Sequence, residues 1–321
     1  EPWAKRGVRS WQVVDSGGTI RAIYDEARGL AGLEAATAFA KRIDGRAGGR
    51  IRAMFAPDRI ETCTPTLLSR TAAIASEMNA PVRQHCLQSA IELRLVQEQH
   101  GVSPIRFLAD NNALGPNWLL PHGTHATPGD MALIAEAGAA LVHCPLVAAR
   151  HGGMLRSLPR WLEAGITVGI GTDTWPPDMI VNMQIGLMTA RIADGHDAIR
   201  SEALFDAATL GGARALGRTD IGRLAPGAKA DIAVIDLHAT LQTTDPVQTL
   251  MASCSGRDVR DVWIDGRRVM ADRVIPGADE KTDVARAQAQ FDGLIEKYPD
   301  RTLGHPPMAE IFQPSYQRGP Q

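Results

Sequence analysis

Four residues suited to metal binding or proton transfer stand at the ends of short apolar runs. They are His85, His122, His143 and Asp173. The runs that lead to them occupy residues 82–85, 118–122, 140–143 and 166–173. Imidazole nitrogens and carboxylate oxygens are common ligands of zinc, and both groups can carry a proton during catalysis. The four side chains could therefore form one site if the fold brings their strand ends together.

The segments between these runs have the pattern of helices. Helices are predicted at residues 65–78, 89–99, 128–137 and 155–164. Short strands that alternate with helices predict repeated βα units and a parallel sheet. In a (β/α) barrel the carboxyl ends of the strands form the active-site face, which would bring the four residues together. A doubly wound sheet is the other option, but its glycine-rich nucleotide turn is absent.

The sequence changes character from Ile221 onward. Residues 221–236 predict turns followed by a buried strand, and residues 259–269 predict a hairpin around Asp265 and Gly266. A helix is predicted at 283–297, before a proline-rich end. We therefore expect a barrel domain at 1–220, part of a β-sandwich at 221–275, and a helix with an extended tail at 276–321.

The composition is that of a globular protein. Apolar residues make up 44% of the 321 residues, and the net charge is −2, so no general field attracts nucleic acid or anionic membranes. The four cysteines lack any CxxC pair, which is typical of reduced thiols in a cytoplasmic enzyme. No apolar run approaches a membrane span. We expect neither nucleic acid nor membrane as a partner.

Several motifs occur in the order found in one enzyme family. They are Pro121-His122-Gly123, Leu141-Val-His-Cys-Pro145, Glu163-Ala-Gly165, Val168-Gly-Ile-Gly-Thr-Asp173 and the segments 207–217 and 221–236. With these motifs the chain resembles the cytosine deaminase/triazine chlorohydrolase branch of the amidohydrolase superfamily. The resemblance implies a (β/α)8 TIM-type barrel with a small β-sandwich appendage and a homo-oligomeric metal-dependent hydrolase. It also implies one divalent metal, with zinc as the default and iron, cobalt or manganese suited to the same ligands.

The resemblance assigns roles to individual residues. His85 and Asp173 match metal ligands, and Asp173 also takes a proton from the activated water. An aspartate at this place could instead cap the next helix, but the shared order of motifs favours the ligand. His122 matches the histidine that manages the proton beside that water. The substrate, a small uncharged molecule, would contact Gln88, His143 and Trp175.

One departure from the family concerns the reaction. The family's strand-five motif is His-x-x-Glu, and its glutamate protonates a ring nitrogen during deamination. Here Gln88 stands in that place, and an amide cannot exchange a proton at working pH. Glu92 lies one helical turn further on and is expected to point elsewhere. Hydrolysis of an amide, urea, carbamate or thiocarbamate is therefore favoured, and a deaminase or dechlorinase of a nitrogen heterocycle is the alternative.

A second departure concerns the metal. The family's first strand supplies two ligands as His-x-His, and the sequence contains no such pair. His85 and Asp173 are too few for catalytic zinc, which usually has three protein ligands. The predicted strands resemble the third to the eighth of the barrel, with 7–14 and 51–55 the earliest. We expect an upstream segment of the same gene product to carry His-x-His; the alternative is a non-catalytic or inactive barrel fragment.

Overall fold

The computed structural model describes residues 10–14, 20–174, 176–238, 241–301, 305–313 and 315–316, with side chains from Tyr24 onward except that of Arg301. These residues form two compact units that meet in the sequence between Arg273 and Val274. Among the described residues, no helix is both long and apolar enough to cross a lipid bilayer.

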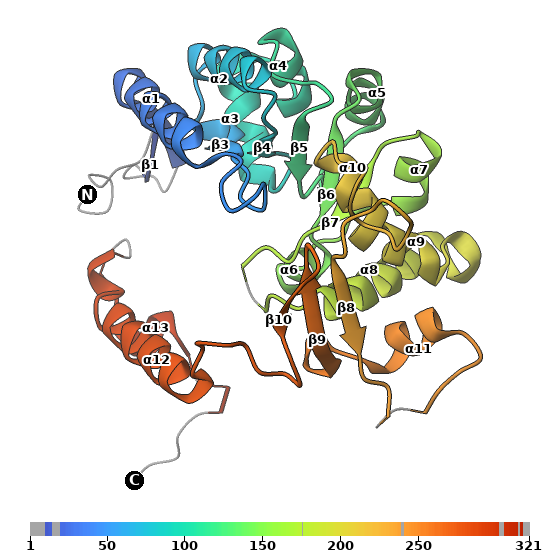
Figure 1. Ribbon diagram of the computed structural model, residues 1–321. Coiled ribbons are helices and arrows are strands. Elements are labelled where there is room, and N and C mark those ends of the chain that lie inside the picture. The colour runs from blue at the N-terminus through green and yellow to red at the C-terminus, as the bar shows by residue number, and fades with distance from the viewer. Residues whose placement is uncertain are drawn as a thin grey trace. The chain divides into compact units, whose positions relative to one another are not determined.

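The larger unit is built on a parallel sheet of five strands. They are β3 (Phe55–Arg59), β4 (Val82–His85), β5 (Trp118–Pro121), β6 (Ala140–His143) and β7 (Val168–Ile170). The strands lie side by side in chain order, and each neighbouring pair is parallel. Such an order, with a helix after every strand, is that of consecutive units in a (β/α) barrel (Figure 1). The predicted fold class is confirmed.

Helices connect the strands and follow the sheet. They are α1 (Glu26–Ile43), α2 (Pro65–Glu77), α3 (Ala90–His100), α4 (Pro104–Asp110), α5 (Pro128–Ala137), α6 (Pro145–Arg150), α7 (Leu158–Glu163), α8 (Met179–Asp194), α9 (Ser201–Asp206), the π-helix η4 (Ala207–Gly211), α10 (Gly212–Ala215) and α11 (Pro246–Ser253). Short 3₁₀ turns are η2 (Ile60–Thr62), η3 (His196–Ala198) and η5 (Gly256–Asp258).

Local sequence explains where several helices begin. The side chains of Thr64, Ser89 and Thr127 each accept a hydrogen bond from a backbone N–H in the first turn of α2, α3 and α5. Proline follows directly after Thr64 and Thr127, where its missing N–H costs nothing. These caps account for the close agreement between the predicted and observed helices in this part of the chain.

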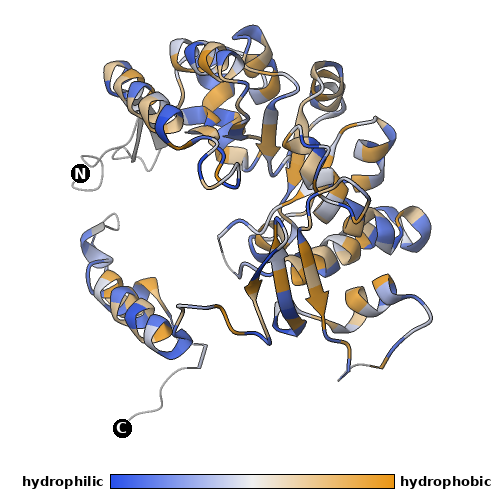
Figure 2. Cartoon of the chain, viewed as in Figure 1, coloured by the Kyte–Doolittle hydropathy of each residue, from blue (hydrophilic) through white to orange (hydrophobic). Residues whose placement is uncertain are grey.

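The core lies along the sheet. All four residues of β5 and all three of β7 are buried, and Figure 2 shows hydrophobic residues along β5, β6 and β7. Strands buried on both faces are typical of parallel sheets covered by helices. Trp118 and Trp161 are among the largest side chains that are almost fully buried.

The first strand of the sheet differs from the prediction. A strand was expected at 51–55, but β3 runs over Phe55–Arg59 and includes Pro57, Asp58 and Arg59. These residues have no apolar pattern, because the carboxyl end of β3 faces a polar site rather than the core. Its pairing with β4 is irregular between Phe55 and Asp58.

The strand predicted at 7–14 also differs. Residues 7–9 lie outside the described residues, and β1 (Ser10–Val14) pairs antiparallel with β2 (Ile20–Tyr24). It therefore does not extend the parallel sheet, and the prediction that residues 7–14 form one of the barrel strands is wrong for the described residues 10–14. A hydrophobic run alone does not reveal which partner a strand will choose.

A separate antiparallel sheet follows the parallel one. It has the order β10-β9-β8, from β8 (Ile232–Ile235), β9 (Val259–Ile264) and β10 (Arg267–Met270). Asp265 and Gly266 join β9 to β10, and both have positive φ, 51° and 74°, as a two-residue hairpin turn requires. The predicted hairpin is confirmed. The domain boundaries at 220/221 and 275/276 stay a prediction, and the compact unit that contains both sheets ends at Arg273.

The smaller unit contains the C-terminal helices. They are α12 (Glu280–Glu296), the 3₁₀ turn η6 (Pro299–Arg301) and α13 (Met308–Ile311). The predicted helix at 283–297 corresponds to α12, which begins one turn earlier because Asp279 caps it. Tyr298 and Phe312 pack edge to face, with ring centroids 5.0 Å apart.

The contact between η4 and β7 yields a test of the fold. A Cβ on Gly211 would lie 2.0 Å from the carbonyl oxygen of Val168, whereas a Cβ on Gly212 would meet its nearest atom at 4.0 Å. We expect Gly211→Ala to lower the free energy of unfolding by about 3 kcal/mol, because two backbones must move apart. Gly212→Ala should raise it by up to about 1 kcal/mol as a helix-favouring change. Denaturant unfolding of both variants checks this, and equal stabilities would contradict the packing described.

Candidate active site

The parallel register brings the predicted site residues to one edge of the sheet. Arg59 pairs with His85 across β3 and β4, and Cys86 forms a bridge to His122. His143 is paired with Ile170 on β7, just before the loop that carries Asp173. Each of these positions is at the carboxyl end of its strand, where barrel enzymes place their active sites.

His85, His122 and Asp173 lie close together at this edge. The rings of His85 and His122 stack with centroids 5.5 Å apart. The Nε2 atom of His122 lies 3.9 Å from an Asp173 carboxylate oxygen. That separation is too long for a direct hydrogen bond, yet Nε2 is buried and has no hydrogen-bond partner among the described residues. The geometry leaves an unsatisfied nitrogen that faces a carboxylate.

Two of these residues have a strained backbone. His122 has φ of 83° and Asp173 has φ of 55°, a region that side chains with a Cβ seldom occupy. Such conformations cost on the order of 1–3 kcal/mol each and cluster at functional sites. Gly123, with φ of 62°, completes the turn after β5. The chain thus turns sharply at the strand ends and presents His122 and Asp173 to the same space.

Burial keeps two of the histidines neutral. The pKa of His122 is lowered to about 4, chiefly by removal from water and then by the nearby His85, while Asp173 opposes the shift. Burial also lowers the pKa of His143 to about 4, and His122 adds to the effect. A neutral imidazole retains an unprotonated nitrogen that can accept a proton or bind a metal. Cys144, in contrast, has its thiol pKa raised to about 12 by burial and is chemically inert.

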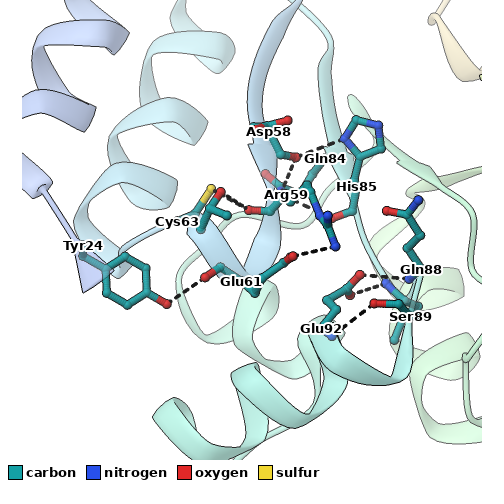
Figure 3. A network of polar contacts seen from close by, with 12 residues as sticks. Tyr24, Asp58, Arg59, Glu61, Cys63, Gln84, His85, Gln88, Ser89 and Glu92 are labelled. Carbon is teal, nitrogen blue, oxygen red and sulfur yellow. Dashed lines mark hydrogen bonds and ion pairs between the residues drawn. The ribbon is translucent and has the colours of Figure 1, made fainter. Parts of the chain in front are cut away.

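Glu92 was expected to point away from the substrate, and its carboxylate is bound to the loop that follows β4. Its carboxylate accepts hydrogen bonds from the backbone N–H groups of Leu87 and, at 2.9 Å, Gln88 (Figure 3). The side chain is fully buried, and burial raises its pKa to about 7 although both hydrogen bonds favour the charged form. Glu92 therefore holds the loop that carries Gln88. The sequence pattern that could have indicated this role is a serine, Ser89, followed three residues later by a glutamate at the start of a helix.

A cavity of about 400 Å³ opens beside His122. Its lining includes Arg59, Gln88, His125, His151 and the loop residue Gly153. Gln88, predicted to bind substrate, lines this cavity, whereas Trp175 lies outside the described residues. A larger cavity of about 830 Å³ lies between α8, α9 and α11 and contains none of the strand-end residues.

Arg59 was missed by the sequence analysis. It lines the cavity from the end of β3, and its guanidinium forms an ion pair of 2.7 Å with the fully buried Glu61 (Figure 3). A buried carboxylate that holds a guanidinium fixes its direction as well as its charge. The strand was predicted at 51–55, four residues before β3. With the correct bounds, a charged residue at the end of a strand would have indicated a site residue.

The residues at the strand ends fit part of a metal site. Imidazole nitrogens and a carboxylate suit zinc and related divalent metals, and the unsatisfied Nε2 of His122 beside Asp173 suits a bound ion or its water. Among the described residues, however, no group of three or more His, Cys, Asp or Glu side chains is arranged to hold a metal. The described site therefore supplies an incomplete set of ligands.

The raised pKa of Glu92 yields a pH test. Its folded pKa of about 7 lies above the ordinary value of 4.5, so protonation favours the folded state. This contribution is complete below pH 4.5 and is lost as the pH rises through 7. Relative to Glu92→Gln, the wild type should lose up to about 3 kcal/mol of stability over that range. Denaturant unfolding at a series of pH values measures this loss of stability. Glu98→Gln, at an exposed position on the same helix, is the control. Parallel pH profiles for the wild type and Glu92→Gln would contradict the assignment.

Comparison with known proteins places this geometry in a family. The model of the amidohydrolase family matches residues 17–269. The 5-methylthioadenosine/S-adenosylhomocysteine deaminase of Halobacterium salinarum is 33% identical over 270 residues, which make up 82% of this chain and 62% of that protein. The protein of the same name from Natronomonas pharaonis is 31% identical and is covered to 66%. The chain thus spans less than two thirds of the length of these relatives.

Solved structures show the same fold. An adenosine deaminase from Xanthomonas campestris with bound zinc has a TM-score of 0.77 at 27% identity, over 84% of this chain and 62% of that one. The atrazine chlorohydrolase of Arthrobacter aurescens, complexed with zinc, has a TM-score of 0.74 at 23% identity over 81% and 60%, which is a likeness of fold alone. The match over residues 17–269 includes every strand of the parallel sheet and all the strand-end residues of the site. The chain is a member of the amidohydrolase family, as its motifs predicted.

Proposed function

We propose that this chain is part of a metal-dependent hydrolase that cleaves a C–N or related bond of a small molecule. The observation that carries the proposal is the buried Nε2 of His122, which faces Asp173 across 3.9 Å beside a cavity of about 400 Å³. A neutral imidazole, a carboxylate and a cavity for a small molecule are parts that hydrolysis by activated water uses. Family membership and the zinc in two structural neighbours support it.

The metal would be held by His85 and Asp173, with zinc as the default and iron, cobalt or manganese as other options. When bound, it would activate a water molecule and polarise the bond to be broken. Asp173 and His122 would take and pass on the proton of that water. Burial lowers the pKa of His122, so its imidazole is unprotonated at neutral pH and its Nε2 can accept a hydrogen bond or a proton.

The substrate would be positioned by polar groups around the cavity. Gln88 can both donate and accept hydrogen bonds, and Glu92 holds its backbone in place. Arg59 presents guanidinium N–H groups to the same cavity from its fixed position on Glu61. His143 is buried beside His122 and would orient the substrate from behind. Trp175 stays a predicted substrate contact.

The leading substrates are an amide, urea, carbamate or thiocarbamate of a small uncharged molecule. The second candidate is an aminohydrolase or dechlorinase of a nitrogen heterocycle. It is favoured by the names of the relatives, which include 5-methylthioadenosine/S-adenosylhomocysteine deaminases and an atrazine chlorohydrolase. Gln88 argues against deamination, because it cannot protonate a ring nitrogen.

We propose that further metal ligands come from an upstream segment of the same gene product that carries His-x-His, because catalytic zinc usually has three protein ligands. All four cysteines are buried and form no disulfide, which supports a cytoplasmic location. Homo-oligomeric assembly is a prediction from the family resemblance.

The proton-handling residues give the first test of function. In the intact gene product loaded with zinc, His122→Asn and Asp173→Asn should each lower kcat/KM at least about 100-fold, the effect expected when a general base is removed. The exposed His196→Asn serves as control and should leave kcat/KM unchanged. Hydrolysis rates over a panel of amides and ureas measure the effect. If no substrate is hydrolysed and no metal is retained by the wild type, the inactive-fragment alternative is correct.

Gln88 gives a test of the reaction type. The wild-type gene product should hydrolyse an open-chain amide, urea or thiocarbamate faster than it deaminates adenosine-type or cytosine-type rings. Gln88→Glu should not raise the rate on the best open-chain substrate, since no ring nitrogen needs a proton there. Ammonia release across both substrate classes decides the matter. Rapid ring deamination by the wild type would favour the second candidate.

A further inference from the structure

The backbone carbonyl of Asp58 receives two hydrogen bonds from the neighbouring strand. The Nε2 amide of Gln84 donates to it at 2.9 Å, and the Nδ1 atom of His85 lies 3.3 Å from it. Figure 3 shows both side chains directed toward this one oxygen from β4. Since a carbonyl oxygen can only accept, the second contact requires the proton of His85 to be on Nδ1.

The backbone of β3 is bent to present this carbonyl. Asp58 has φ of 91°, and the pairing of β3 with β4 is irregular between Phe55 and Asp58. Irregular pairing at a strand end commonly re-aims a group beside an active site. A positive φ at a residue with a Cβ persists only where the surroundings enforce it. The Asp58 side chain is exposed, and the peptide is held by the contacts of its carbonyl and by the pairing of β3 with β4 at Asp58 and Arg59.

The stability of the fold does not by itself explain why a glutamine is buried at position 84. It is fully buried, and its Oε1 atom has no hydrogen-bond partner among the described residues. A buried amide with an unsatisfied oxygen is often no better than an apolar side chain of the same shape. Its Nε2 nevertheless reaches Asp58 and, at 3.4 Å, the carbonyl of His85. The hydrogen bonds that its amide N–H groups donate to the carbonyls of Asp58 and His85 therefore explain why Gln84 is buried here.

We propose that Gln84 and the Asp58 carbonyl together act as a positioning pair that fixes the tautomer and ring orientation of His85. With the proton held on Nδ1, the lone pair of Nε2 is left available as a metal ligand. Hydrogen bonds of this kind set which imidazole nitrogen binds metal in other proteins. The role of this tautomer in metal binding rests on the proposed function. The tautomer itself can be observed without any metal.

The test is the tautomer of His85 in the metal-free chain. The ¹⁵N chemical shifts of the imidazole ring report the tautomer at a pH where the ring is neutral. The chain has nine histidines, and the signals of His85 are identified as those that disappear in His85→Gln. The wild type should show mainly the Nδ1–H form. Gln84→Met should let the Asp58 peptide move out of line with Nδ1 of His85, and loss of that one ordinary hydrogen bond should shift the ratio toward Nε2–H by about three- to tenfold. Gln84→Asn, which withdraws the amide by one methylene, should do the same if Gln84→Met fails to fold.

Two controls separate positioning from general damage. Gln97→Met replaces an exposed glutamine on α3 and should leave the tautomer ratio unchanged. Asp58→Gly keeps the carbonyl and relieves the positive φ, so it should retain the Nδ1–H form with equal or greater thermal stability. A wild type with mainly Nε2–H, or folded Gln84 variants with an unchanged ratio, would overturn the proposal.

A zinc titration of the intact gene product tests the link to the metal. Gln84→Met should weaken the affinity for Zn²⁺ by about 10- to 100-fold, as expected for loss of a group that orients a ligand. Unchanged affinity would overturn the ligand part of the proposal. An inactive gene product in which His85 keeps the Nδ1–H form would contradict the proposed function but leave the positioning role of Gln84 intact.

Discussion

The parallel register of five consecutive strands is the constraint on which the site depends. Parallel strands with helices between them end at the same edge, so the chain can place Arg59, His85, His122 and His143 together although they span 85 positions, from 59 to 143. An antiparallel arrangement would send alternate residues to opposite edges. The helices contribute by covering the sheet and by starting at capped positions, which fixes how long each loop at the active edge can be.

At that edge the backbone departs from regular strand geometry at several positions. Asp58, Leu87, His122 and Asp173 all have positive φ, and each lies at or just beyond a strand end. The energy of such conformations must come from the surrounding structure, and here buried side chains supply it. Glu92 holds the Leu87 turn, and Gln84 holds the Asp58 peptide. Both are buried polar residues whose partners are backbone groups of the active edge, so stability and site geometry are coupled.

The electrostatics follow from burial. His122 and His143 are kept neutral, the thiol of Cys144 is kept protonated, and the guanidinium of Arg59 is held by buried Glu61. The result is an edge of the sheet with neutral imidazoles, next to a cavity that Arg59 and His122 help to line. Glu92, with its pKa near 7, is the buried acid closest in sequence to Gln88, and its oxygens are already bound to the backbone. It serves the loop rather than the cavity.

The sequence by itself determined the fold class, the family, the strand-end histidines, Asp173 and the hairpin at Asp265, because each depends on local composition, spacing or motif order. The tertiary structure alone decided the position of β3, the antiparallel pairing of β1, the direction of Glu92 and the pairing of Arg59 with Glu61. It also decided that a single carbonyl, that of Asp58, meets both Gln84 and His85. These features depend on which segments become neighbours and on backbone angles at strand ends, and neither is written in the hydrophobic pattern of any one segment.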